Sequence, residues 1–163
     1  MERPPSKKSL SIELQELFNS DQADRVSLQD KESNSDSWNL IADNDAKRLV
    51  SARKIYDEYT KGAIDLSNEE MVQLAFLFQH SLEMEEYKKV VELGNAAGEE
   101  GKWIAAAGED RWLISRGEKQ KWGTQFTYDG NQAPMLSDEE SGITDEMRQD
   151  RGIPVRAKQV SDH

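Results

Sequence analysis

Apolar residues recur at helical spacing along most of the chain, and this pattern predicts five main helices. In each run the apolar side chains stand three or four positions apart, which places them on one face of a helix. The predicted helices span 9–29, 43–60, 68–81, 83–97 and 102–116. Residues 30–37 are rich in Asp, Ser and Asn, and we interpret them as a loop.

The third predicted helix has the strongest pattern. Ser67 stands at the N-cap position and Glu70 three residues later, which is the spacing of a capping box. From Met71 to Phe78 the helix is apolar on nearly all sides, with Gln73 as the exception. A helix of this kind is typical of the centre of a fold.

The chain after residue 116 has a different pattern. Residues 120–128 are rich in aromatic and β-branched residues, and they predict an extended segment or short hairpin closed by Asp129-Gly130. Residues 137–150 contain six acidic residues and one arginine, and they predict a loop and a short helix that Pro154 stops. We therefore predict a mainly all-α fold, a helical bundle or an array of helical hairpins with one short extended segment.

Composition limits the domain organisation and the partners. The 163 residues suit one domain, which we assign to 9–155, with flexible tails at 1–8 and 156–163 where apolar residues are few. With 32 acidic and 21 basic residues the net charge is −11, so we expect neither nucleic acid nor a membrane surface as a partner. No signal peptide is evident, and the longest apolar run is too short to span a bilayer, so we expect a cytoplasmic protein.

Residue types also limit the chemistry. The absence of cysteine excludes disulfides, thiol catalysis and thiolate metal sites. One of the two histidines is the last residue, so a histidine-rich zinc site is not expected. We predict neither a metal nor a cofactor, and nothing in the sequence specifies an oligomeric state.

Polar residues interrupt the apolar faces of four predicted helices. They are Asp21 and Arg25 on the first, Arg48 on the second, Gln79 and His80 at the end of the third, and Asp110 and Arg111 on the fifth. Burying a charge is costly unless the charge is paired and hydrogen-bonded. Two interpretations stay open: a buried ionic network that fixes how the helices pack, or a polar pocket that binds a small molecule.

Two features bear on the pocket interpretation. A lone histidine at the end of an apolar helix is more often a hydrogen-bonded core residue, yet histidine is the residue best suited to proton transfer at neutral pH. In the extended segment, Gly123 permits close approach of the backbone, and Thr124 and Gln125 offer donors and acceptors. That composition suits a ligand-facing loop or a β-bulge. Trp103, Trp112 and Trp122 are more typical of core residues than of a stacking platform.

Several short motifs occur in a fixed order along the chain. They are Asp21-Gln22-x-x-Arg25, Asp45-x-x-Arg48-Leu49, Gln79-His80, Asp110-Arg111, Gln120-x-Trp122-Gly123-Thr124-Gln125-Phe126 and Arg148-x-x-x-Gly152-Ile153-Pro154. Together they resemble a family of uncharacterised bacterial proteins of unknown function, from about residue 13 to 155, with Trp122 where that family has tyrosine. The resemblance implies no reaction, but it implies the same site positions as the interrupted helix faces.

The resulting hypothesis is a small helical enzyme or small-molecule-binding protein with a ligand of the carboxylate type. His80 would move a proton in metal-independent acid–base chemistry, with Asp110 orienting it or pairing with Arg111. Arg25, Arg48 and Arg111 would hold the anionic group. The other expected ligand-binding residues are Asp21, Gln79, Gln120, Trp122, Thr124 and Gln125. The alternative is a noncatalytic interaction module, an adaptor or inhibitor, whose inner polar network is structural.

Overall fold

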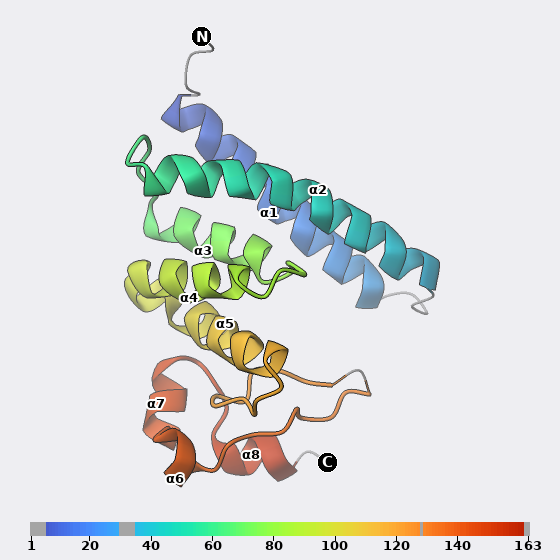
Figure 1. Cartoon of the computed structure of the whole chain (residues 1–163), viewed down its shortest axis with the longest axis vertical. Helices are drawn as coiled ribbons and strands as arrows, with labels where there is room; N and C mark the ends of the chain where they lie inside the picture. Colours follow the sequence, from blue (N-terminus) through green and yellow to red (C-terminus); the bar gives the residue numbers. More distant parts are fainter. Residues whose placement is uncertain (1–5, 30–34, 128, 162–163) are drawn as a thin grey trace.

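The computed structural model describes residues 6–29, 35–127 and 129–161, and helices dominate these ranges (Figure 1). The long elements are α1 (Lys7–Gln29), α2 (Ser35–Thr60), α3 (Asn68–Phe78), α4 (Glu86–Ala96) and α5 (Lys102–Ser115), with a 3₁₀ turn at Gly98–Gly101 between the last two. The short helices are α6 (Asp138–Ser141), α7 (Asp145–Asp150) and α8 (Arg156–Ser161). The prediction of a mainly all-α fold is confirmed. None of the described helices combines the length and apolar character needed to cross a bilayer.

Helices α1, α3 and α5 lie side by side. Three pairs join α1 to α3 in the same order along both helices: Gln15 with Gln73, Phe18 with Phe76, and Asp21 with His80 just beyond the end of α3. The two helices are therefore parallel. Trp103 of α5 extends the row, because its ring stacks on Phe76 at a centroid distance of 6.0 Å. Helix α2 packs on α1 and α3, and α4 packs on α3 and α5, which gives an array of helical hairpins (Figure 1).

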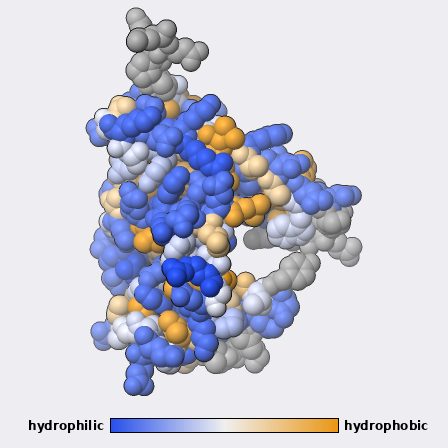
Figure 2. All heavy atoms as spheres, in the orientation of Figure 1, coloured by the Kyte–Doolittle hydropathy of each residue, from blue (hydrophilic) through white to orange (hydrophobic). Residues whose placement is uncertain are grey.

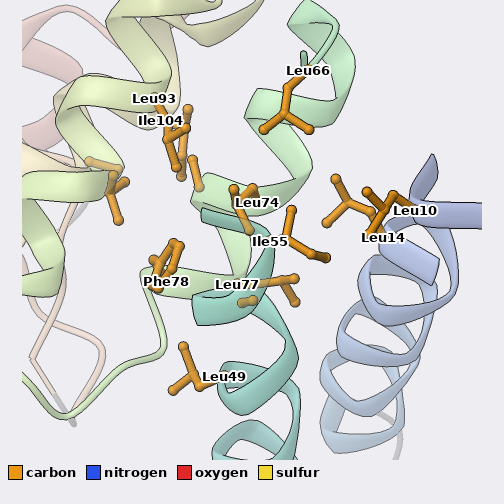
Figure 3. Close-up of a cluster of buried hydrophobic side chains, with 14 residues drawn as sticks. Leu10, Leu14, Leu49, Ile55, Leu66, Leu74, Leu77, Phe78, Leu93 and Ile104 are labelled. Carbon is orange, nitrogen blue, oxygen red and sulfur yellow. The ribbon is translucent and has the colours of Figure 1, made fainter. Parts of the chain in front are cut away.

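The core lies on both sides of α3 (Figure 3). Leu74 and Phe78 are fully buried, in contact with leucines and isoleucines from α1, α2, α4 and α5. The capping box at Ser67 and Glu70 is present and begins α3 at the expected residue. The central position predicted for this helix is confirmed.

The chain after α5 folds against that helix. Phe126 and Gln132 form an isolated antiparallel bridge, and the amide of Gly130 donates to the carbonyl of Thr127 at 2.9 Å, so the expected short hairpin is present. A second, smaller core joins this part to α5, and its buried residues are Ala106, Trp122, Ile143 and Ile153.

Helix α2 begins earlier than its sequence pattern predicts. Residues 35–37 were expected in a loop but form the first turn of α2, while residues 30–34 lie outside the described ranges. Ile41 is buried and Asp45 pairs with Arg25 of α1. These contacts along α1 support a longer helix than the loop-like composition of this region suggested.

The described parts of the two expected tails are largely helical in the structure. Residues 1–5 lie outside the described ranges, and α1 already begins at Lys7. Residues 156–161 form α8, while 162–163 are not described. Gln159 is 7% exposed and its Nε2 donates to the carbonyl of Trp122 at 3.0 Å. Polar contacts hold this segment, so a count of apolar residues could not reveal it.

Candidate functional site

Most of the residues predicted to form one pocket lie in two groups. The first, which we term the ion cluster, comprises Asp21, Asp24, Arg25, Asp45, Arg48 and His80. The second, the loop anchor, comprises Asp110 and Gln120 with the segment 121–125 that they hold. Arg111 follows Asp110 in the chain but faces a separate cavity, described below.

In the ion cluster two arginines bind the same carboxylate. Nη1 and Nη2 of Arg25 donate to the two oxygens of Asp45, both at 2.8 Å. Nη2 of Arg48 donates to Asp45 Oδ1 at 2.7 Å and lies 2.8 Å from Oδ2 of Asp24. Burial raises the pKa of Asp45, but the hydrogen bonds from both arginines outweigh that effect and hold the pKa below its ordinary value. The two guanidinium groups are thus already bound by protein carboxylates.

Asp21 supplies the carboxylate beside His80. It is 1% exposed, and Gln22 Nε2 donates to its Oδ2 at 3.0 Å. Its Oδ1 is surrounded by three nitrogens: Arg25 Nη1 at 3.2 Å, His80 Nε2 at 3.4 Å and Arg48 Nε at 3.9 Å. None of these meets hydrogen-bond geometry, so the contacts with the two arginines are purely electrostatic. Asp110, which we expected to orient His80, lies elsewhere.

His80 lines a small cavity between α2 and the turn that follows α3. The cavity has a volume of about 210 Å³, and its walls include Ala42, Asp45, Leu49, Arg53 and Leu82. Because Nε2 of His80 faces Asp21, Nδ1 is the ring nitrogen left for another partner, and no described residue hydrogen-bonds to it. Gln79, next to it in the chain, is buried.

In the loop anchor one buried carboxylate fixes the segment after α5. Asp110 is 0% exposed. Its Oδ1 accepts from the amides of Lys121 at 2.8 Å and Trp122 at 2.9 Å, and its Oδ2 accepts from the amide and hydroxyl of Thr124 at 3.0 and 2.7 Å. Burial raises the pKa of Asp110 above its ordinary value, although these hydrogen bonds act in the opposite direction. Asp110 therefore positions backbone and does not contact His80 or Arg111.

Gln120 and Trp122 complete the loop anchor. Gln120 Nε2 donates to the carbonyls of Gln125 and Ala133, and its Oε1 accepts from the Gln125 amide, all at 2.9 Å. Trp122 is 4% exposed, and the guanidinium of Arg151 lies 4.5 Å from the centre of its ring. Trp122 is a core residue, as its type suggested.

Arg111 lines the largest of the three cavities described for this chain, at about 680 Å³. The cavity lies between the end of α5 and the hairpin, and Tyr87, Ser115, Gln125 and Phe126 are among its walls. The surface is visibly hollowed between the far end of the α1–α2 hairpin and the part of the chain after α5 (Figure 2).

The guanidinium of Arg111 is half-buried and has no carboxylate partner among the described residues. It interacts with the hydroxyl of Tyr87, and its Nε is buried without a hydrogen-bond partner. Burial lowers the pKa of Arg111; the interaction with Tyr87 opposes this, and repulsion from Arg25 adds to it. Tyr87 in turn donates to the carbonyl of Ser81 at 2.8 Å, which links Arg111 to the turn that carries His80.

Two carboxylates of the ion cluster were absent from the predicted site. Asp45 stands three residues before Arg48, a spacing that brings side chains together on a helix, and Asp24 stands three residues after Asp21. That spacing is the signal that could have revealed both. Arg148 is also fully buried, paired with Asp138 and Asp145, but α7 has six residues and is too short to show an interrupted apolar face.

Comparison with known proteins adds no relative to this picture: no family model matches the chain, and neither a curated protein nor a solved structure gives a significant match.

Proposed function

We propose that the protein binds a small anionic molecule of the carboxylate type in the cavity lined by Arg111. The observation that carries this proposal is the half-buried guanidinium without a carboxylate partner among the described residues. An unpaired buried charge is unfavourable, and a bound carboxylate would supply the missing partner through charge-assisted hydrogen bonds.

The surroundings of Arg111 support a small ligand. The volume of about 680 Å³ falls within the range of about 300–1,000 Å³ typical of small-molecule pockets. Tyr87, Ser115 and Gln125 offer polar groups, and Phe126 offers an apolar surface. Arg25 and Arg48, which we also expected to hold the anion, are already bound to Asp45, so the proposal assigns the anion to Arg111 alone.

Thermal unfolding and titration calorimetry with acetate, succinate, benzoate and phosphate test this proposal. We expect at least one of these anions to raise the melting temperature of the wild type and to lose that effect in Arg111→Met. The variant without ligand should be at least as stable as the wild type, because it removes an unpaired buried charge. Arg116→Met is the matched control, since Arg116 lies five residues further along the chain at the end of α5, is exposed and stacks on Trp112.

The control should respond like the wild type. Equal responses of the wild type and Arg111→Met would contradict the proposal. If none of the four anions affected the wild type, the noncatalytic interaction module would become the better interpretation.

Proton transfer by His80 is a second candidate function, favoured by the proximity of Asp21. In such a step Nδ1 would accept a proton from a bound molecule, and the Asp21 carboxylate would stabilise the resulting imidazolium. The cavity at His80, about 210 Å³, limits that molecule to a small one. A pH dependence of ligand binding that disappears in His80→Gln would support this role, and an unchanged pH dependence would oppose it.

A further inference from the structure

The hairpin after α5 also lines a third cavity, which the proposed function does not use. This cavity has a volume of about 300 Å³, the lower end of the range typical of small-molecule pockets. It lies between the start of α5, the hairpin and the C-terminal segment, and its walls include Trp103, Thr124, Phe126, Ile153, Lys158 and Gln159.

Two aromatic rings stand at this cavity with much of their surface uncovered. Trp103 is 38% exposed and Phe126 is 61% exposed. Phe76 stacks on the indole of Trp103 at an interplanar angle of 11°, which holds the indole in place. Aromatic side chains fixed beside a cavity favour a planar ring as ligand, because stacking adds to the gain from burying apolar surface.

The buried side-chain amide of Gln159 indicates which polar group a ligand in this cavity would carry. Gln159 is 7% exposed, and its Nε2 is used in a hydrogen bond to the carbonyl of Trp122. Its Oε1 is buried and accepts no hydrogen bond from any described residue. A buried acceptor without a donor is unfavourable, so this oxygen favours a ligand that carries an N–H group. Lys158, also in the wall, favours a negative charge on the same ligand.

We propose that this cavity binds a planar nitrogen heteroaromatic molecule with a ring N–H donor and an acidic substituent. The ring packs on Trp103 and Phe126, the N–H group donates to Gln159, and the acidic group lies toward Lys158. The site shares Phe126 with the Arg111 cavity, but its other binding groups are different ones, and it does not depend on the function proposed for Arg111.

Three probes of similar size separate these features in titration calorimetry on the full chain. Indole-3-acetate has the ring, the N–H donor and the carboxylate; 1-naphthaleneacetate lacks the donor; cyclohexaneacetate lacks both the donor and the aromatic ring. We expect affinity to fall in that order. Trp103→Leu should weaken the binding of indole-3-acetate by at least about fivefold, in line with the loss of one stacking partner.

Two variants locate the binding. Trp38→Leu is the matched control, because Trp38 is 48% exposed on α2 and lines none of the three cavities. Arg111→Met removes the other anion site, and indole-3-acetate should bind this variant as it binds the wild type.

Four outcomes would overturn the proposal: no binding of indole-3-acetate, equal affinity for all three probes, unchanged binding in Trp103→Leu, or loss of binding in Arg111→Met with retention in Trp103→Leu. The last outcome would place the probe at Arg111 and so support the function proposed above. The order of affinities is measured on the wild type, so this test stands even where Trp103→Leu fails to fold.

Discussion

Asp21 and Asp110 are both buried carboxylates that interrupt apolar helix faces, yet their surroundings differ. Asp110 accepts four hydrogen bonds from one short segment, three of them from backbone amides. Asp21 lies beside two arginines and a histidine from three parts of the chain, and its Oδ1 accepts no hydrogen bond of good geometry.

The difference shows two uses of a buried negative charge. Backbone amides cannot leave Asp110 without unfolding the loop, so that carboxylate determines the local chain path. The cationic side chains around Asp21 can reorganise. If the Asp21 carboxylate is removed, Arg25 and Arg48 still have Asp45 as a partner. We therefore expect the loop anchor to contribute more to stability than the contacts of Asp21.

The largest predicted effect is that of Asp110→Ala. It strands three backbone amides and a hydroxyl in a buried region, which should lower the free energy of unfolding by about 3 kcal/mol or more. Asp21→Ala should cost only about 1–2 kcal/mol, because its cationic neighbours retain other carboxylates. Urea unfolding followed by circular dichroism measures both. An equal or larger loss for Asp21→Ala would contradict the expectation that the loop anchor contributes more to stability than the contacts of Asp21.

The helices were predictable where one local pattern decided the structure. Helix α3 is apolar on nearly all sides and carries its own capping box, so its position and start followed from adjacent residues. The start of α2 and the whole of α8 were not predictable in this way. In α8, for example, the side chain of Gln159 donates to the backbone carbonyl of Trp122, 37 residues earlier in the chain.

The sequence pattern identified four of the six residues of the ion cluster, but not how they pair. Asp21, Arg25 and Arg48 stood out because each interrupts an apolar face. Helical periodicity does not say which residues meet across helices, and Asp45 binds an arginine twenty residues away. The four donors to Asp110 come from a segment without helical period, so the pattern could not distinguish a loop anchor from a catalytic carboxylate.

The two regions should also respond to pH with opposite sign. The pKa of Asp45 lies below its ordinary value of 3.8, so its contribution to stability is present above about pH 3.8 and is lost as the pH falls through the folded-state pKa. The pKa of Asp110 is raised, so the pH-dependent part of its contribution is fully present below about pH 3.8 and is lost as the pH rises through the folded-state pKa, whereas the four hydrogen bonds that it accepts are a separate contribution.

Unfolding free energies of the wild type, Asp45→Asn and Asp110→Asn between pH 7 and pH 3 check this expectation. As the pH falls, the difference in unfolding free energy between the wild type and Asp45→Asn should become smaller. The corresponding difference between the wild type and Asp110→Asn should become larger. Parallel curves for the two variants would show that the two carboxylates do not differ in the way we describe.

The smallest predicted effects separate the two regions by their sensitivity to salt. Arg25→Lys keeps the charge but loses the paired hydrogen bonds to Asp45, and Arg25 is 28% exposed, so we expect a loss of about 0.5–1 kcal/mol. Thr124→Val removes one of the four hydrogen bonds to Asp110 at nearly constant volume and should cost about 1 kcal/mol.

In 1 M NaCl the loss of unfolding free energy caused by Arg25→Lys should become smaller, because ions screen a partly exposed ion pair. The loss caused by Thr124→Val should change less, because the hydroxyl is uncharged and the carboxylate to which it donates is fully buried. Equal salt dependence of the two losses would mean that the ion cluster is as well shielded from solvent as the loop anchor.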